Sequence, residues 1–124
     1  MDAMLEMAWR QVLRAAHHLD WSSSRLQHFL APERVTEVAV TDPSTGEVVR
    51  ALRVQHSTTL GPAKGGVRMT NAVTRTEVEA LALYMTLKTA TAGLPLGGGK
   101  GGIVVDGGSM GADDRETLCL LYTS

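Results

Sequence analysis

Hydrophobic residues recur along the chain with two different periods, and these periods predict an alternation of helices and strands. Apolar side chains at helical spacing predict an amphipathic helix over residues 2–19. Its apolar stripe consists of Leu5, Ala8, Val12, Ala15 or Ala16, and Leu19. Possible capping residues follow, among them Ser22, so a second short helix is expected over residues 25–30.

Two segments rich in β-branched residues predict a β-hairpin. These segments are residues 35–40 and 48–56. The residues between them, 42–46, are of the types that form turns. Side chains alternate along a strand, so Arg53 is expected to point away from the face that carries Leu52 and Val54.

The second half of the chain predicts another helix and a glycine-rich loop. Thr74 and Glu77 have capping-box spacing, and Gly93 follows at the expected helix end. The glycine run 97–102 is expected to be a loop that leads into a short buried strand at residues 103–105. Because helices and strands alternate without a linker, the sequence predicts one layered α/β domain.

Composition narrows the class of protein. A chain of 124 residues with 44% hydrophobic residues can bury a core but is long enough for only one domain. A net charge of −1 with scattered arginines argues against a nucleic-acid partner. No apolar run is long enough to cross a bilayer, and the N-terminus carries acids where a secretory signal has Lys or Arg. We therefore expect a cytoplasmic protein.

The end of the chain and its single cysteine carry no predicted function. Residues 119–124 resemble the in-frame translation of an adaptor used in sequencing libraries, so we assign the domain to residues 1–118. With only Cys119 present, no internal disulfide can form. The four histidines lack metal-ligand spacing, so no metal site is expected; His56 is at most a neighbour of a pocket.

Three lysines stand out as candidates for chemistry. The chain contains only Lys64, Lys88 and Lys100, and its other strong positive charges are arginines. Only lysine combines a compact ammonium with a proton that can be removed when the group is desolvated. Lys64 and Lys100 adjoin double glycines, where a ligand can approach the backbone closely. Lys88 shares a helical stripe with Val78, Leu81 and Met85, a stripe expected to face the core. Together they favour an anion-binding site over three unrelated surface lysines.

Two nucleotide-binding motifs fail on context. Gly97-x-Gly99-x-x-Gly102 matches a dinucleotide fingerprint as a string, but it follows a helix and leads into a strand, the reverse of that motif. A phosphate-binding loop of the Walker A type fails because Leu94 replaces its first glycine and Gly101 its hydroxyl residue. No cofactor-binding residues are expected in this chain.

Residues 54–106 strongly resemble the N-terminal domain of the glutamate/leucine/phenylalanine/valine dehydrogenase family. The matching segments, in order and with matching spacing, are Val54-Gln55-His56, Gly61-Pro62-Ala63-Lys64-Gly65-Gly66-Val67-Arg68, Met85-Thr86-Leu87-Lys88 and Leu94-Pro95-Leu96-Gly97-Gly98-Gly99-Lys100-Gly101-Gly102. The resemblance implies a mixed sheet flanked by helices, with no Rossmann domain in this chain.

The resemblance also implies roles for individual residues. Lys100 corresponds to the catalytic lysine, which polarises the substrate carbonyl and helps to activate water. Lys88 corresponds to the lysine that binds the substrate α-carboxylate, and Met85 lines the same pocket. Lys64 corresponds to the lysine that pairs with a side-chain carboxylate. Four glycines are expected to keep the pocket walls close to the substrate: Gly65, Gly66, Gly98 and Gly99.

Lys64 favours the branch of the family that acts on glutamate. Members that act on leucine, valine or phenylalanine tend to carry an apolar residue there, since a buried cation would reject an aliphatic side chain. Those members are the first alternative, and Arg68-Met69 and Ala92-Gly93-Leu94 look more like them. A non-catalytic assembly or sensing module with the same fold is the second.

The family pattern implies partners and a missing part. The cofactor would be NAD or NADP, bound by a domain beyond this chain, so the fragment alone is expected to be inactive. The full-length protein is expected to be a homo-oligomer, with a hexamer favoured, in part because the hairpin offers strand edges that can pair between subunits.

Overall fold

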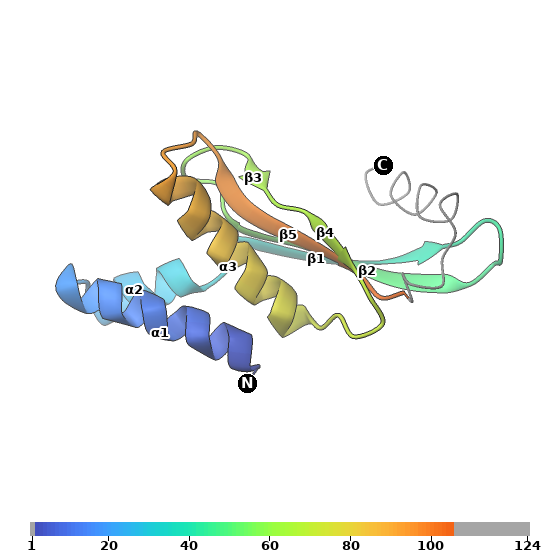
Figure 1. Cartoon of the computed structure of the whole chain (residues 1–124), viewed down its shortest axis with the longest axis horizontal. Helices are drawn as coiled ribbons and strands as arrows, with labels where there is room; N and C mark the ends of the chain where they lie inside the picture. The colour runs from blue at the N-terminus through green and yellow to red at the C-terminus, as the bar shows by residue number, and fades with distance from the viewer. Residues whose placement is uncertain (1, 106–124) are drawn as a thin grey trace.

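A computed structural model of the chain describes residues 2–105. The expectations for Cys119 and for a domain boundary at residue 118 lie outside these residues. Within the described part the order of elements is α1 (Ala3–His18), α2 (Ser23–Leu30), β1 (Arg34–Thr41), β2 (Val48–Ser57), β3 (Ala63–Lys64), β4 (Val67–Met69), α3 (Arg75–Thr91) and β5 (Gly97–Ile103) (Figure 1). The three predicted helices and the hairpin are confirmed to within two residues at most ends, whereas β3 and β4 were not predicted.

The sheet is mixed, as the family resemblance implied. Its order is β1-β2-β5-β3, and β4 also pairs with β5. Strand β2 is antiparallel to both β1 and β5, whereas β3 and β4 run parallel to β5. The strand β5 is therefore central, with β2 on one side and β3 and β4 on the other.

The prediction of a glycine loop at residues 97–102 is wrong, because these residues form most of β5. Of the strand expected at residues 103–105, only Ile103 belongs to a strand. Glycine carries no hydrophobic signal, so the periodicity could not reveal the strand. Pairing on both sides outweighs the poor strand propensity of glycine here.

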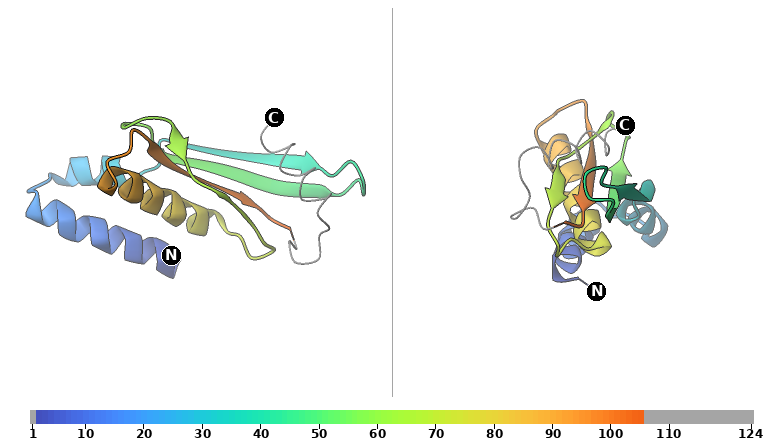
Figure 2. Two further views of the ribbon diagram at one scale, coloured as in Figure 1. Left: turned by 45° about the horizontal axis from the view of Figure 1, so that its top comes forward. Right: turned by 90° about the vertical axis from the view of Figure 1, so that its right-hand side faces the viewer.

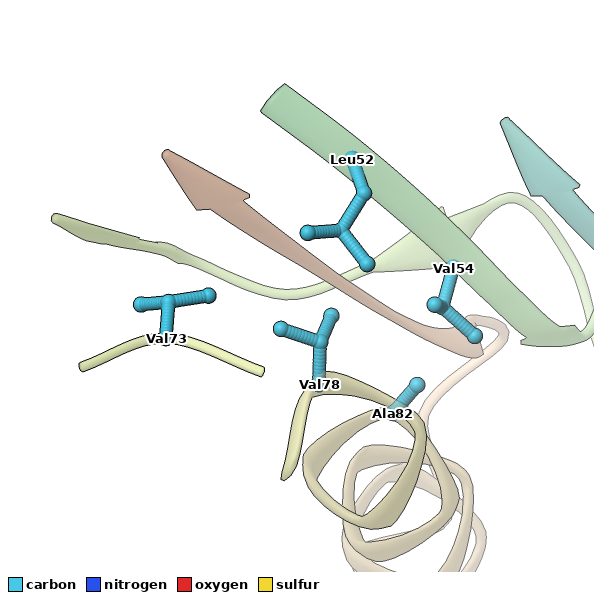
Figure 3. Packing of buried hydrophobic residues seen from close by; sticks show 5 residues of the cluster. All are labelled: Leu52, Val54, Val73, Val78 and Ala82. Carbon is cyan, nitrogen blue, oxygen red and sulfur yellow. The ribbon is translucent and has the colours of Figure 1, made fainter. Parts of the chain in front are cut away.

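The helices form two layers on one side of the sheet (Figure 2). Helix α3 packs on β2 and β5, and Figure 3 shows Leu52 and Val54 of β2 facing Val78 and Ala82 of α3, with Val73 beside them. Helix α1 packs on the other side of α3, where Ala8 and Val12 contact Leu83. A second apolar cluster, Val49, Ala51 and Ile103, lies on the opposite face of the sheet.

Local signals explain where α1 begins and which face it buries. The Asp2 carboxylate accepts a hydrogen bond from the Met4 backbone N–H at 2.9 Å and so caps the helix. The expected stripe is buried at Leu5, Ala8, Val12 and Ala16. Leu19 departs from the prediction: it lies at the C-cap and is 62% exposed. No helix within residues 2–105 is long and apolar enough to cross a membrane.

Helix α3 begins at a genuine cap but not at a complete capping box. The Thr74 hydroxyl accepts from the Glu77 backbone N–H at 3.2 Å, as the spacing predicted. The Glu77 carboxylate instead forms an ion pair with Arg68 of β4, with an N–O distance of 3.1 Å. This ion pair ties the first turn of α3 to the sheet edge formed by β3 and β4.

The close approach of α3 to β5 yields a stability prediction. A Cβ at Gly98 would collide with the backbone N and the hydroxyl of Thr86. Because backbone cannot rotate away, we expect Gly98→Ala to lower the free energy of unfolding by about 3 kcal/mol. At the matched control Gly66→Ala, the nearest atom is the mobile Lys100 Nζ at 3.5 Å, so we expect a change within about 0.5 kcal/mol. Urea denaturation of both variants measures the difference, and equal effects would contradict the packing described here.

Candidate functional site

Two of the three lysines lie on neighbouring parallel strands. Lys64 of β3 is in register with Gly98 of β5, and Lys100 follows two residues later on β5. The Lys100 ammonium lies 3.5 Å from the position that a Cβ on Gly66 would occupy. Lys64 is exposed and Lys100 is half-buried. The structure therefore brings Lys100 beside the double glycine that follows Lys64.

Lys88 does not lie on the core-facing stripe of α3, contrary to the prediction. The buried stripe on the sheet side of α3 consists of Val78, Ala82, Thr86 and Thr89, at steps of four, four and three residues. The expected stripe through Leu81 and Met85 is only half-buried, and Lys88 at its end is exposed. The predicted and the observed stripe both have helical spacing, and their mean directions differ by less than a quarter turn about the helix axis.

The flank of α3 that carries Lys88 is tied to β4 at its start. Glu77, at the start of the same flank, is held by Arg68 of β4. Lys88 lies eleven residues later, about three turns along the same side of the helix. At that level Thr86 contacts Gly98, which is the register partner of Lys64. Met85 and Lys88 thus lie one residue before and two residues after Thr86 in α3, with Met85 half-buried and Lys88 exposed.

Three arginines in the described part of the chain have acidic partners, and the lysines have none there. Arg10 pairs with Glu6, Arg68 with Glu77, and Arg75 with both Glu37 and Glu79. Within residues 2–105, none of the three lysines has an ion pair or a side-chain hydrogen bond. Their ammonium groups are therefore available to an anion from outside the described part of the chain.

Two of the four candidate glycines, Gly65 and Gly98, are required by the packing of the chain itself, and a third, Gly99, has close neighbours. A Cβ on Gly65 would collide with the Gly99 carbonyl, and one on Gly98 with Thr86. A Cβ on Gly99 would lie 3.1 Å from Nη2 of Arg53. Only Gly66 faces the Lys100 ammonium without another close neighbour. These contacts allow the segments that carry Lys64 and Lys100 to lie close together.

A buried histidine supports the glycine strand from the side of α3. His56 is 3% exposed; its Nδ1 lies 2.8 Å from the Thr86 hydroxyl and its Nε2 2.8 Å from the Phe29 carbonyl oxygen. A carbonyl can only accept, so Nε2 carries the hydrogen and Nδ1 accepts from Thr86. Burial lowers the pKa of His56 from its ordinary value of 6.5, which keeps the ring neutral. His56 is thus a structural partner of Thr86.

Thr86 and Arg53 are the residues near the site that the sequence analysis did not select. Threonine is a weak helix former, and Thr86 lies four residues after Ala82 on the sheet-facing side of α3, a combination that could have revealed it. Arg53 was assigned to the correct sheet face, but nothing in the sequence identified its partners.

Within residues 2–105 no group of three His, Cys, Asp or Glu side chains lies close enough to hold a metal ion. The dinucleotide fingerprint Gly97-x-Gly99-x-x-Gly102 lies along a strand instead of at a strand-to-helix turn. It therefore lacks the helix N-terminus that binds a pyrophosphate. The arrangement leaves Lys64 and Lys100 near each other on adjacent strands, without an ion pair within residues 2–105.

Comparison with known proteins shows which family the chain resembles. Residues 32–124 match the Glu/Leu/Phe/Val dehydrogenase dimerisation domain. The chain is 43% identical over 125 residues to a glutamate dehydrogenase from Thermotoga maritima, covering 98% of the chain and 30% of that protein. It is 37% identical over 122 residues to an NAD-specific glutamate dehydrogenase from Clostridioides difficile, covering 96% of the chain and 29% of that protein.

The fold is also that of a solved glutamate dehydrogenase. The hetero-hexameric enzyme from Thermus thermophilus, in a leucine-bound form, superimposes with a TM-score of 0.82 at 33% identity. The match covers 99% of this chain and 30% of that one. The chain therefore spans about 30% of the length of the relatives that it matches.

The neutral, buried His56 predicts a loss of stability in acid. Its folded pKa lies below the unfolded value, so the unfolded chain takes up the proton first and the folded state loses stability as pH falls below about 6.5. In the wild type this loss is at most about 1.4 kcal/mol of unfolding free energy per pH unit. We expect His56→Gln, which can still donate to Phe29, to abolish this contribution. Urea denaturation between pH 7.5 and 5.5 measures it. The exposed His28, changed to Gln, is the control, and an identical pH dependence of both variants would refute the assignment.

Proposed function

The chain belongs to the Glu/Leu/Phe/Val dehydrogenase family, and we propose that it is the substrate-binding front part of a glutamate dehydrogenase. The reaction would be the reversible oxidative deamination of L-glutamate to 2-oxoglutarate and ammonia. The observation that carries this proposal is Lys64: it is an unpaired cation, in register with Gly98, at the strand edge next to the half-buried Lys100. A cation there suits a substrate with a side-chain carboxylate.

Each lysine receives a distinct role in this proposal. Lys100 polarises the substrate carbonyl and helps to activate water at the iminium carbon. Lys88 binds the α-carboxylate that all amino-acid substrates share, and Met85 lines the pocket beside it. Lys64 binds the side-chain carboxylate of glutamate. Gly66 leaves open space above the Lys100 ammonium, and Gly65, Gly98 and Gly99 keep the surrounding segments close.

Hydride transfer requires a cofactor, and in our proposal these 124 residues do not bind it. The cofactor would be NAD or NADP, bound by the remainder of a full-length protein, consistent with the 30% coverage of the relatives. One of them is named NAD-specific. The 124-residue chain alone would then show no turnover, and residues 1–118 would form one N-terminal domain of a cytoplasmic enzyme.

The competing substrate class is the aliphatic or aromatic amino acids used by other members of the family. Such substrates lack a second carboxylate and would leave the Lys64 charge unpaired in the complex. A replacement of this one residue therefore separates the two possibilities.

Substitution of the lysines in the full-length protein tests the proposed roles. We expect Lys64→Leu to lower kcat/KM for glutamate, because the broken charge pair weakens transition-state binding by about 2–5 kcal/mol. The same change should improve the relative use of norleucine or methionine. Lys100→Ala should mainly abolish kcat, and Lys88→Ala should raise KM for every amino acid. Steady-state kinetics with glutamate and norleucine measure these effects. Unchanged glutamate turnover in Lys64→Leu would reject glutamate as the substrate while leaving the family intact.

Assembly is the second part of the proposal. Among the strands of residues 2–105, β1 pairs only with β2 and so forms an edge of the sheet, and its Val38 is 46% exposed. An exposed edge can pair with another copy of the chain.

We expect the full-length protein to be a homo-oligomer, most simply a hexamer with closed symmetry. Light scattering coupled to gel filtration should give six times the protomer mass. Val38→Lys should weaken this assembly, whereas Leu13→Lys, at an exposed position of α1, should not. A monomeric mass at micromolar concentration would contradict the proposal.

A further inference from the structure

An arginine on the sheet face opposite α3 holds the backbone on both sides of Lys64. Arg53 of β2 donates from Nη2 to the Ala63 carbonyl and from Nη1 to the Gly65 carbonyl, each at 3.3 Å. The two carbonyls belong to the residues immediately before and after Lys64. The guanidinium thus contacts the Lys64 segment at two points, although Arg53 is eleven residues away in the chain.

Arg53 reaches this segment across a strand that carries glycine at the crossing point. Strand β5 lies between β2 and β3 in the sheet. A Cβ at Gly99 would lie 3.1 Å from Arg53 Nη2 and 3.2 Å from the Ala63 Cβ. The arginine side chain therefore crosses β5 over Gly99, where a larger side chain would stand in its path.

The Lys64 segment needs such support. Strand β3 consists of Ala63–Lys64 alone and lies at the edge of the sheet, so β5 is its only strand partner among the described residues. An edge segment can open between its anchor points, which here are the backbone hydrogen bonds from Gly97 N–H to the Pro62 carbonyl and from Gly101 N–H to the Gly66 carbonyl. Arginine suits the task because its planar fork presents two donors in fixed directions, whereas the lysine ammonium is a point charge. Within residues 2–105 Arg53 forms no ion pair, which leaves its fork to these two carbonyls.

We propose that Arg53 is a positioning residue that fixes the backbone of Lys64 and thereby sets the affinity for the side-chain carboxylate of the substrate. The inference rests on the proposed function for the role of Lys64. Arg53 does not touch the substrate, because it acts through the carbonyls of Ala63 and Gly65 from the other face of the sheet. Arg53 is accordingly a determinant of specificity, separate from the chemistry at Lys100.

The positioning itself is tested without reference to any substrate. Hydrogen exchange in the full-length protein, followed by mass spectrometry, reports local opening of residues 60–68. We expect Arg53→Gln to increase exchange in this segment about tenfold, and Arg53→Lys to lie between it and the wild type. The matched control is Arg50→Gln, since Arg50 lies on the same strand with an exposed side chain. Unchanged exchange in both Arg53 variants overturns the proposal, whatever the substrate is.

A double-mutant cycle tests the connection to Lys64. With glutamate we expect Arg53→Gln to raise KM about tenfold while kcat stays within about twofold, since Lys100 is untouched. In the Lys64→Leu background the same change should alter KM less than about twofold, because the residue it positions is already gone. An equal effect in both backgrounds overturns the proposal. Arg53→Lys should recover part of the affinity and keeps the test valid if Arg53→Gln unfolds.

The two experiments separate the failure of this inference from the failure of the proposed function. Faster exchange at residues 60–68 in a protein that does not oxidise glutamate would reject glutamate as the substrate and retain Arg53 as the support of Lys64. Normal glutamate turnover by Arg53→Gln with unchanged KM would reject the role of Arg53 and retain the function.

Discussion

The fold depends on a central strand that has almost no side chains. Five of the seven residues of β5 are glycine, and each neighbour lies close to one of them: α3 through Thr86 at Gly98, and β2 and β3 through Arg53 and Ala63 at Gly99. Glycine in a strand costs about 0.5–1 kcal/mol of backbone entropy per residue relative to alanine. That cost is offset because β5 pairs on both edges and is covered by α3, so its backbone hydrogen bonds are buried and satisfied.

This constraint also gives Lys100 its surroundings. It is the one charged residue of β5, and the glycines around it let the Gly65–Gly66 segment lie beside its ammonium group. The two faces of the strand are supported by different means. On the α3 side a neutral His56 holds Thr86 above Gly98, and on the other side Arg53 passes over Gly99. A lysine in such a strand is held in place by backbone and by its neighbours' contacts, with few side chains of its own strand to compete for a ligand.

The sequence predicted those parts of the structure whose signals are local and periodic. The stripe Leu5–Ala8–Val12 located α1, and turn residues between two β-branched segments located the hairpin. The glycine run was misread as a loop because glycine has no hydrophobicity to alternate. The expectation that Lys88 lies on the core-facing stripe of α3 is wrong because a stripe at steps of three, four and three residues is as helical as the buried one at four, four and three. The contacts of Arg53 and His56 join residues 10 to 30 positions apart, which no local pattern encodes. The choice of the three lysines rested on residue type and family motif instead of on geometry.

Arginine and lysine side chains have different surroundings in this structure. Paired arginines in this chain stabilise its structure, as at Arg68–Glu77 and Arg75–Glu79, because a planar fork forms directional hydrogen bonds that persist. The lysines have no internal partner among residues 2–105. In the proposed complex with glutamate, Lys88 and Lys64 each receive one carboxylate, so neither of these two cations is left unpaired. A site of this kind favours a dicarboxylate over a monocarboxylate before any contact with the rest of the substrate is made, since the second carboxylate neutralises a charge that would otherwise remain unpaired.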